Sequence, residues 1–222
     1  MKKLTYCNAS DENISKNGCK HIEHKGTNET AEEFMNRLNK DMQEHVDENR
    51  KQELYSMSFD EKRKMIKNNQ NLDVFIDDTD PLVRAEVANQ GYGLDSLVND
   101  EDYHVRCSVG EQGYGLNKLV NDESVWVRQI VAKKGYGLDR LVYDEDESVR
   151  VAVTYQGYGL DKLINDKDCL VRAVIAKQGY GLDKLANDDD EDIRKSVRHY
   201  LKENGLTLDE WKEKYPEKVV EK

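Results

Sequence analysis

The 222-residue sequence has only two prolines and four cysteines, and it has no long apolar run. A membrane-spanning helix needs about 18 or more consecutive apolar residues, so none is expected. The first residues include two lysines but no apolar segment, and they predict no secretory signal. Four scattered cysteines are too few for a disulfide framework and favour a reduced, cytoplasmic protein.

The sequence also has no excess of positive charge. The 34 Lys and Arg residues face 45 Asp and Glu residues, so the net charge is −11. Proteins that bind the nucleic-acid backbone directly need a surplus of Lys and Arg, so such binding is not expected. Hydrophobic residues make up 37% and charged residues 36% of the chain, which is polar but compatible with a folded domain. With so few prolines, helices are the expected secondary structure.

What the sequence does contain is an internal repeat. The tetrapeptide Gly-Tyr-Gly-Leu begins at Gly91 and returns every 22 residues up to Gly179. A second marker, Val-Arg, begins at Val83 and keeps the same spacing up to Ile193-Arg194. Two markers in fixed register over five full units establish a repeat array.

Each unit predicts two short helices. Acidic residues before the Val-Arg marker provide a helix N-cap and favourable charge for the helix dipole. Val105 and Val109 then lie on one helical face, and Gly113 suits the position just past the helix end. Leucines three residues apart predict a second, shorter helix. One unit cannot bury its apolar face alone, so the units must stack. The predicted fold is all-α, with an α-solenoid of 22-residue two-helix repeats over residues 58–211 and degenerate units at both ends.

These features resemble the leucine-rich repeat variant group, which is related to HEAT-like solenoids. The resemblance rests on the 22-residue period, the Asp-rich segment, the Val-Arg-x-x-Val-Ala helix and the Leu-x-x-Leu-Val helix, and it covers roughly two-thirds of the chain. It implies α-helices paired with 3₁₀ helices, and it does not identify a partner. Some members of the group carry an N-terminal cysteine cluster for an iron–sulfur centre, whereas only Cys7 and Cys19 precede this array.

Residues 1–57 are predicted to form an N-terminal arm and a capping helix. Thr30 and Glu33 have the spacing of a capping box, and apolar residues at every fourth position follow. An amphipathic helix is therefore expected from residue 30 to about 50, with its apolar stripe docked on the first repeat. Residues 1–26 are predicted to be a short β-hairpin or an irregular arm, and residues 212–222 a C-terminal tail.

One group of side chains in the arm is of the metal-binding type. It consists of Cys7, Cys19, His21 and His24. Structural zinc sites usually contain a close Cys-x₂₋₄-Cys pair, which this spacing lacks. Ordinary surface positions are therefore favoured over a zinc or iron–sulfur site, and no cofactor is expected.

Two residue types recur once per unit. The arginines of the Val-Arg marker are interpreted as bidentate partners of the Asp clusters, linking adjacent units, in preference to a phosphate-binding ladder. The tyrosines of Gly-Tyr-Gly are interpreted as packing contacts, in preference to a base-stacking platform. No combination of nucleophile, base and orienting group is recognisable, so no enzymatic activity is expected.

Acidic residues recur at one position of the repeat, so stacking would align them along one edge. The densest clusters are formed by Asp144, Glu145, Asp146, Glu147, Asp188, Asp189, Asp190, Glu191 and Asp192. Helix capping and solubility explain part of this edge, but five consecutive acids exceed what one cap requires.

Positions of the longer helix that face away from the core vary between units, and they predict a partner-binding patch. The patch consists of His104, Trp126, Gln129, Lys133, Val151, Tyr155, Leu170 and Lys177. Exposed large aromatics such as Trp126 and Tyr155 are typical of protein interfaces. The alternative is that Trp126 packs against a neighbouring unit.

These observations favour a non-enzymatic protein-binding scaffold, whose partner is another protein and whose oligomeric state the sequence leaves open. A first alternative is an acidic inhibitor of a nucleic-acid-binding enzyme, a nucleic-acid mimic of the phage anti-defence or anti-CRISPR type. A second alternative is a metal-binding or enzymatic role of the N-terminal arm.

Overall fold

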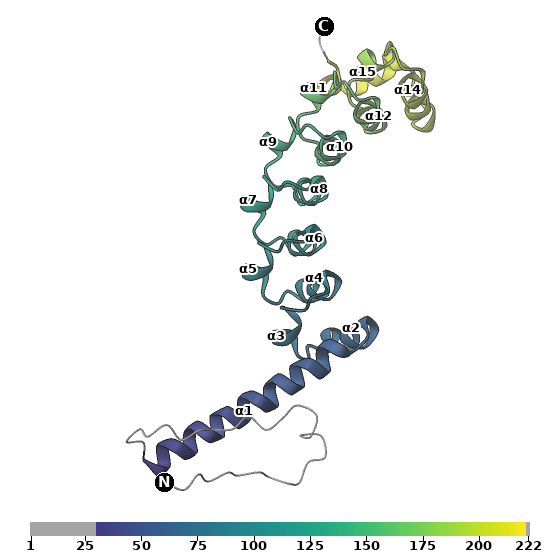
Figure 1. Cartoon of the computed structure of the whole chain (residues 1–222). Helices are drawn as coiled ribbons and strands as arrows, with labels where there is room; N and C mark the ends of the chain where they lie inside the picture. Colours follow the sequence, from purple (N-terminus) through teal and green to yellow (C-terminus); the bar gives the residue numbers. More distant parts are fainter. Residues whose placement is uncertain (1–29, 221–222) are drawn as a thin grey trace. The chain divides into compact units, whose positions relative to one another are not determined.

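Residues 30–220 are described by a computed structural model, in which they form helices joined by short turns and contain no strand (Figure 1). The chain divides into two units, Met1–Glu53 and Leu54–Lys222. The predicted all-α class is therefore confirmed for the described residues. The β-hairpin expected over residues 1–26 lies outside them.

The first helix, α1 (Ala31–Ser56), begins at the predicted capping box. Thr30 donates from its backbone N–H and its hydroxyl to Glu33 Oε2, at 2.7 and 2.9 Å. The helix continues beyond the predicted end near residue 50. Met42 and Val46, which were expected on a docked apolar stripe, are more than half exposed, whereas Leu54 near the helix end is buried.

In the second unit, a long helix alternates with a short one. The pairs are α2 (Phe59–Lys67) and α3 (Leu72–Phe75), α4 (Pro81–Asn89) and α5 (Leu94–Leu97), α6 (Tyr103–Glu111) and α7 (Leu116–Leu119), α8 (Val125–Lys133) and α9 (Leu138–Leu141), α10 (Glu147–Tyr155) and α11 (Leu160–Leu163), and α12 (Cys169–Lys177) and α13 (Leu182–Leu185). From α4 to α12 the long helices follow one another in one row, and the short helices from α3 to α11 form the opposite edge (Figure 1). This arrangement confirms the predicted solenoid of two-helix repeats.

The core runs continuously from repeat to repeat. Val105 and Val109 of α6, predicted on one face, are completely buried, as are their counterparts Val127 and Val131 of α8. Leucines that close the short helices, such as Leu119, join the same cluster. Each long helix therefore buries one face against its neighbours and leaves the other face to solvent.

Each of the five full repeats turns between its helices on two glycines in the left-handed region. Gly91 has a φ of +76° and Gly93 a φ of +62°, and a Cβ on Gly93 would lie 2.1 Å from Ile76 Cδ1. Asn69 and Asn71 take these two places one repeat earlier, with φ values of 55° and 54°. Asparagine tolerates this region better than most residues. The degenerate first unit is thus a complete repeat in register.

The C-terminal end closes on non-repeated residues. Helix α14 (Glu191–Glu203) is longer than the preceding ones, and α15 (Leu208–Lys214) buries Trp211 completely. After the 3₁₀ turn Pro216–Lys218, the Gly181 N–H donates to the Lys218 carbonyl at 2.9 Å. Residues 212–220, which the sequence predicted to be a tail, therefore pack against the last short helix.

Candidate protein-binding surfaces

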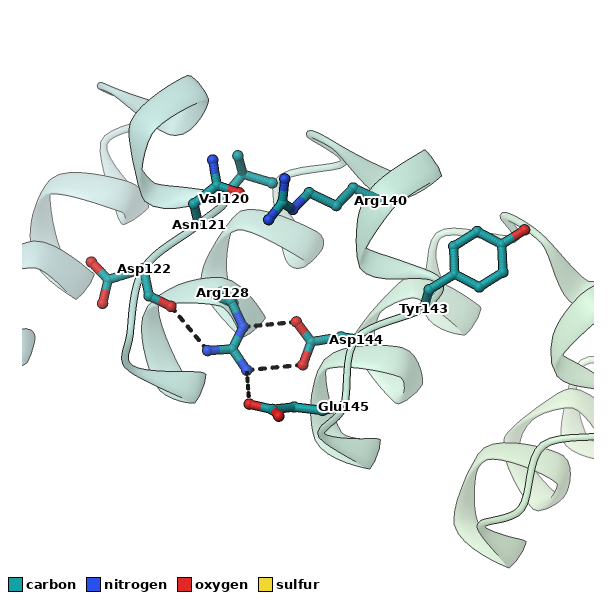
Figure 2. Close-up of a pocket in the computed structure, with 8 residues that line it drawn as sticks. All are labelled: Val120, Asn121, Asp122, Arg128, Arg140, Tyr143, Asp144 and Glu145. Carbon is teal, nitrogen blue, oxygen red and sulfur yellow. Dashed lines mark hydrogen bonds and ion pairs between the residues drawn. The ribbon is translucent and has the colours of Figure 1, made fainter.

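From α4 to α12, an arginine of each long helix links its repeat to the next one. Arg128 of α8 donates from Nε and Nη2 to the two carboxylate oxygens of Asp144, at 2.7 and 2.9 Å. Its Nη1 also donates to the Asp122 carbonyl at 2.9 Å, so one side chain joins the turns before α8 and α10 (Figure 2). Bidentate geometry fixes both distance and orientation, so Arg128 sets the register of these two layers.

The same contacts recur along the array. Bidentate pairs with donor–acceptor distances of 2.6–3.0 Å join Arg84–Asp100, Arg106–Asp122, Arg128–Asp144, Arg150–Asp166 and Arg172–Asp188. The architectural interpretation is confirmed for these five arginines, because their guanidinium groups already pair with carboxylates and carbonyls of the fold. Arg194, the last arginine of the Val-Arg marker, does not follow the prediction, because its carboxylate partner is Glu191 of its own helix.

The ion pairs keep their charges near neutral pH. Burial alone would raise the pKa of Asp100, but hydrogen bonds from Arg84 and from the Asp102 N–H outweigh it and lower the pKa. Asp166 and Asp188 have lowered pKa values for the same reasons. The hydrogen bond to the carboxylate in turn raises the pKa of each arginine in these pairs.

Much of the predicted acidic edge has a structural role. Asp144 and Asp188 are the arginine partners described above. Asp146 and Asp190 cap α10 and α14 by accepting a backbone N–H from two residues ahead. Glu191 accepts hydrogen bonds from two arginines of its own helix.

The remaining acids of that edge face solvent. Asp192 is exposed and pairs with Lys195 at 2.8 Å. Glu147 and Asp189 are exposed, and Glu145 is exposed with its carboxylate 3.7 Å from Arg128 Nη2. The row of acids is therefore much less negative than the sequence suggests, because arginines neutralise its recurring aspartates.

The outward face of the long helices carries large apolar side chains. Trp126 on α8, Tyr155 on α10 and Leu170 on α12 are 58%, 65% and 60% exposed. Trp126 therefore does not pack into a neighbouring repeat, which was the alternative interpretation. Helix α10 packs against both α8 and α12, so the three side chains lie on successive neighbouring helices, Trp126 and Leu170 near the helix starts and Tyr155 at a helix end.

The other residues of the predicted patch lie on α6, α8, α10 and α12. His104, Lys133 and Lys177 are exposed, whereas Gln129 and Val151 are half-buried between helices. Gln129 Oε1 accepts a hydrogen bond from Lys133 at 3.3 Å. Two of the residues predicted from sequence, Gln129 and Val151, therefore offer little surface to a partner.

Charge on this face differs from that of the whole chain. Helices α8 and α12 contain no acidic residue, and α10 contains only Glu147, at its first position. Lys133 and Lys177 lie at the far ends of α8 and α12. A face with two lysines and almost no carboxylate is unusual in a chain of net charge −11, and it suits a partner with acidic and apolar side chains.

Sequence reasoning missed Tyr143, which is 70% exposed. It lies at the start of the turn before α10, where the other full repeats have asparagine, as at Asn121. Lys162 Nζ lies 5.3 Å from the centroid of its ring, a cation–π contact. Tyr143 also borders a shallow depression with Arg140 (Figure 2). Comparison of equivalent positions, rather than of the long helices alone, would have found it.

The tyrosines of the Gly-Tyr-Gly turns are less packed than predicted. Tyr180 is half-buried and contacts the core. Four others, the tyrosine row, are 37–43% exposed, and they are Tyr92, Tyr114, Tyr136 and Tyr158. The packing interpretation is therefore correct for Tyr180 and incomplete for the row.

Residues 30–220 contain few side chains suited to metal binding or nucleophilic catalysis. This part of the chain brings together no group of three or more His, Cys, Asp or Glu side chains suited to a metal ion. Cys7, Cys19, His21 and His24 lie outside the described residues. Burial raises the pKa of Cys107 to about 11, so its thiol stays protonated and is a poor nucleophile.

The structure defines the chain as a helical repeat protein, and no helix within residues 30–220 is long and apolar enough to span a bilayer. Comparison with protein-family models, with curated proteins and with solved structures gave no match.

Proposed function

We propose that this protein is a non-enzymatic protein-binding scaffold, with its main contact on the outward face of α8, α10 and α12. The observation that carries the proposal is the exposure of Trp126, Tyr155 and Leu170 on adjacent helices. Large aromatics that a partner can desolvate supply much of the energy at protein interfaces. Repeat arrays commonly use such extended surfaces.

Rigidity between layers supports this role. Arg128 and Arg150 join α8, α10 and α12 to one another through bidentate pairs with Asp144 and Asp166. A surface that is held in place before binding loses less conformational entropy when the partner docks. The resemblance to leucine-rich repeat variants and HEAT-like solenoids supports the same role, because such arrays present helix faces to partners. A reduced, cytoplasmic location agrees with the sparse cysteines.

The acidic-inhibitor function has weaker support. A nucleic-acid mimic needs free carboxylates in a regular row. The aspartates of the Arg–Asp pairs are not free, and the exposed acids that follow them at the next position are three glutamates, Glu101, Glu123 and Glu145, together with Asp189. Each of the three glutamates lies within 4 Å of an arginine nitrogen, which further reduces its field.

The test is affinity capture from native lysate with the full chain and two variants. A double variant, Trp126→Ala with Tyr155→Ala, removes the proposed contact, and Tyr143→Ala removes an equally exposed aromatic elsewhere. We expect the double variant to lose the partner and Tyr143→Ala to retain it, with circular dichroism spectra unchanged for both. Retention of the partner by a folded double variant would refute this assignment of the contact.

A further inference from the structure

The long helices α8, α10, α12 and α14 present exposed residues at equivalent positions near their ends. These positions lie six residues after the first residue of the Val-Arg marker and contain Lys133, Tyr155, Lys177 and His199, and Lys202 follows one helical turn later on α14. All five side chains are exposed. Helix α10 packs against α8 and α12, and α14 packs against α12, so the positions follow one another from helix to helix. These five residues are called the basic edge.

Carboxylates are scarce in the chain segments that carry the basic edge. Asp and Glu are missing from four segments, which are residues 126–138, 148–160, 170–182 and 193–202. Within residues 30–220, Lys177 and Lys202 form no ion pair, and Lys133 donates to Gln129 of its own helix at 3.3 Å. Glu203 follows Lys202 directly and offsets one of the three lysines.

The other charges along these segments occur in pairs of opposite sign. Ion pairs with nitrogen–oxygen distances of 2.5–3.1 Å join Lys134–Glu111, Lys195–Asp192 and Arg198–Glu191. In the short helices, each aspartate is followed directly by an exposed cation, as in Asp139–Arg140, Asp161–Lys162 and Asp183–Lys184. The charge that is left over on the basic edge is therefore positive, although the chain as a whole is acidic.

The fold does not require cations at these positions. The helix dipole favours a cation near a helix end, but α4 and α6 have Asn89 and Glu111 at the equivalent position. Their helices still end in the same way: the Tyr114 N–H donates to the Val109 carbonyl at 3.3 Å, and α8 ends with the equivalent bond at 3.2 Å. The repeat thus accepts a neutral or an acidic residue here, and the lysines from α8 onward are available to a ligand.

Acids at the opposite ends of these helices favour a short acidic peptide over a nucleic acid. Glu145, Glu147 and Asp189 are exposed at the starts of α10 and α14. A helix of nine residues is about 13 Å long, so a narrow ligand on the basic edge stays roughly one Debye length away from them at 0.1 M salt. A nucleic-acid duplex, whose major groove alone is about 12 Å wide, would extend over them. A single strand needs several stacking rings, and the basic edge contains one tyrosine.

We propose that the basic edge binds an acidic segment of the protein partner. Carboxylates of the segment pair with Lys133, Lys177 and Lys202, and one of its apolar side chains packs on Tyr155. This inference rests on the proposed protein-binding function. It adds the chemistry of the partner and extends the contact to α14.

Glutamate peptides provide the test. A fluorescently labelled peptide of eight glutamates around a central leucine is titrated into the full chain at 50 mM NaCl and followed by anisotropy. The same peptide with glutamine in place of glutamate should bind roughly 10-fold more weakly, because exposed ion pairs contribute about 0.2–1 kcal/mol each. A strand of nine thymidylates carries eight phosphates, and it should bind more weakly than the glutamate peptide.

Variants locate the site on the chain. Lys177→Gln with Lys202→Gln should weaken binding of the glutamate peptide roughly 5-fold. Lys118→Gln with Lys184→Gln is the matched control: it removes the same charge from exposed positions of the short helices, and it should bind as the parent does. Circular dichroism spectra should be unchanged in both variants.

Three results would overturn the proposal: no binding of the glutamate peptide, equal binding of the thymidylate strand, or an equal loss in the control variant. Trp126 lies at a helix start, outside the basic edge. Trp126→Ala should therefore weaken capture of the partner without changing the affinity for the glutamate peptide, so the two proposals fail separately.

Discussion

Lys62 Nζ lies 2.7 Å from Asp78 Oδ2, and this buried pair occupies the places that Arg84 and Asp100 hold one repeat later. Lysine makes one contact where arginine makes two with the carboxylate. The first repeat therefore keeps the ion pair of the array while losing the planar fork that fixes its orientation. The first repeat thus shows that the fold accepts a buried ion pair without the bidentate geometry. Replacing an arginine of the array by alanine or by lysine separates the two contributions.

We expect Arg128→Ala to lower the free energy of unfolding by about 3–5 kcal/mol, because it leaves Asp144 buried without its counter-charge. Arg128→Lys should cost clearly less, since Lys62 shows that lysine is accommodated at this position. Urea denaturation followed by circular dichroism measures both. Equal losses in the two variants would mean that the hydrogen-bond geometry, rather than the charge, supplies the stability.

The same pairs predict how stability depends on pH. The pKa values of Asp100, Asp166 and Asp188 are lowered in the folded chain, so these groups bind protons more readily when it unfolds. Their stabilisation is fully present above the ordinary aspartate pKa of about 3.9 and is lost as pH falls through the lowered values.

Urea midpoints measured from pH 7 to pH 2.5 test this. We expect little contribution from these pairs to any change between pH 7 and 5, and a steep fall below about pH 4. Asp166→Asn removes one titrating group, so its stability, although lower, should decline less steeply in acid. If the urea midpoint of Asp166→Asn falls as steeply below pH 4 as that of the parent, other carboxylates control acid unfolding.

Repetition made most of the fold predictable. Identical residues every 22 positions give the register, and that register places Val105 in the core and Arg106 beside the acids of the next unit. The ends were harder, because their contacts are not repeated. Nothing in the pattern indicates that the Val220 N–H would meet Asp183 or that Lys218 would meet Gly181.

The candidate surface was predictable in part for the same reason. Variable positions on a known helical face identified Trp126 and Tyr155, because helical geometry alone decides which side chains point outward. Gln129 and Val151 satisfy the same rule, yet they are half-buried because neighbouring helices cover them. Exposure in the turns depends on the path of the backbone rather than on periodicity, and therefore Tyr143 was missed.

The two glycines of one turn should differ in their tolerance of alanine. Gly135 and Gly137 have φ values of +74° and +62°, so both substitutions incur the left-handed penalty of about 1–2 kcal/mol. A Cβ at Gly137 would also lie 2.5 Å from Val120 Cγ2, whereas at Gly135 its nearest neighbour is Gln156 Oε1, at 3.7 Å.

Overpacking should add about 1–3 kcal/mol to the cost of Gly137→Ala. Thermal and urea denaturation of the two single variants gives the comparison directly, and each variant serves as the control for the other. Equal destabilisation would indicate that Val120 moves aside at little cost, and that backbone conformation alone selects glycine in this turn.

Charge on the outward face gives the last prediction. Lys133 and Lys177 lie beside the apolar contact on helices that contain no acid, so an acidic partner should associate faster because of them. Reversing both, as Lys133→Glu with Lys177→Glu, should lower the association rate about 10-fold at low salt, with a smaller effect on dissociation. Surface plasmon resonance with the captured partner, at 50 and 300 mM NaCl, measures both rates.

The matched control reverses two lysines on the short helices, as Lys118→Glu with Lys184→Glu, and changes the net charge by the same amount. These lysines are exposed and lie away from the long-helix face. Because electrostatic steering weakens with distance and salt, the control should slow association far less, and high salt should remove most of the difference. Equal slowing in both variants would mean that the partner responds to overall charge and that the lysines of the outward face have no special role.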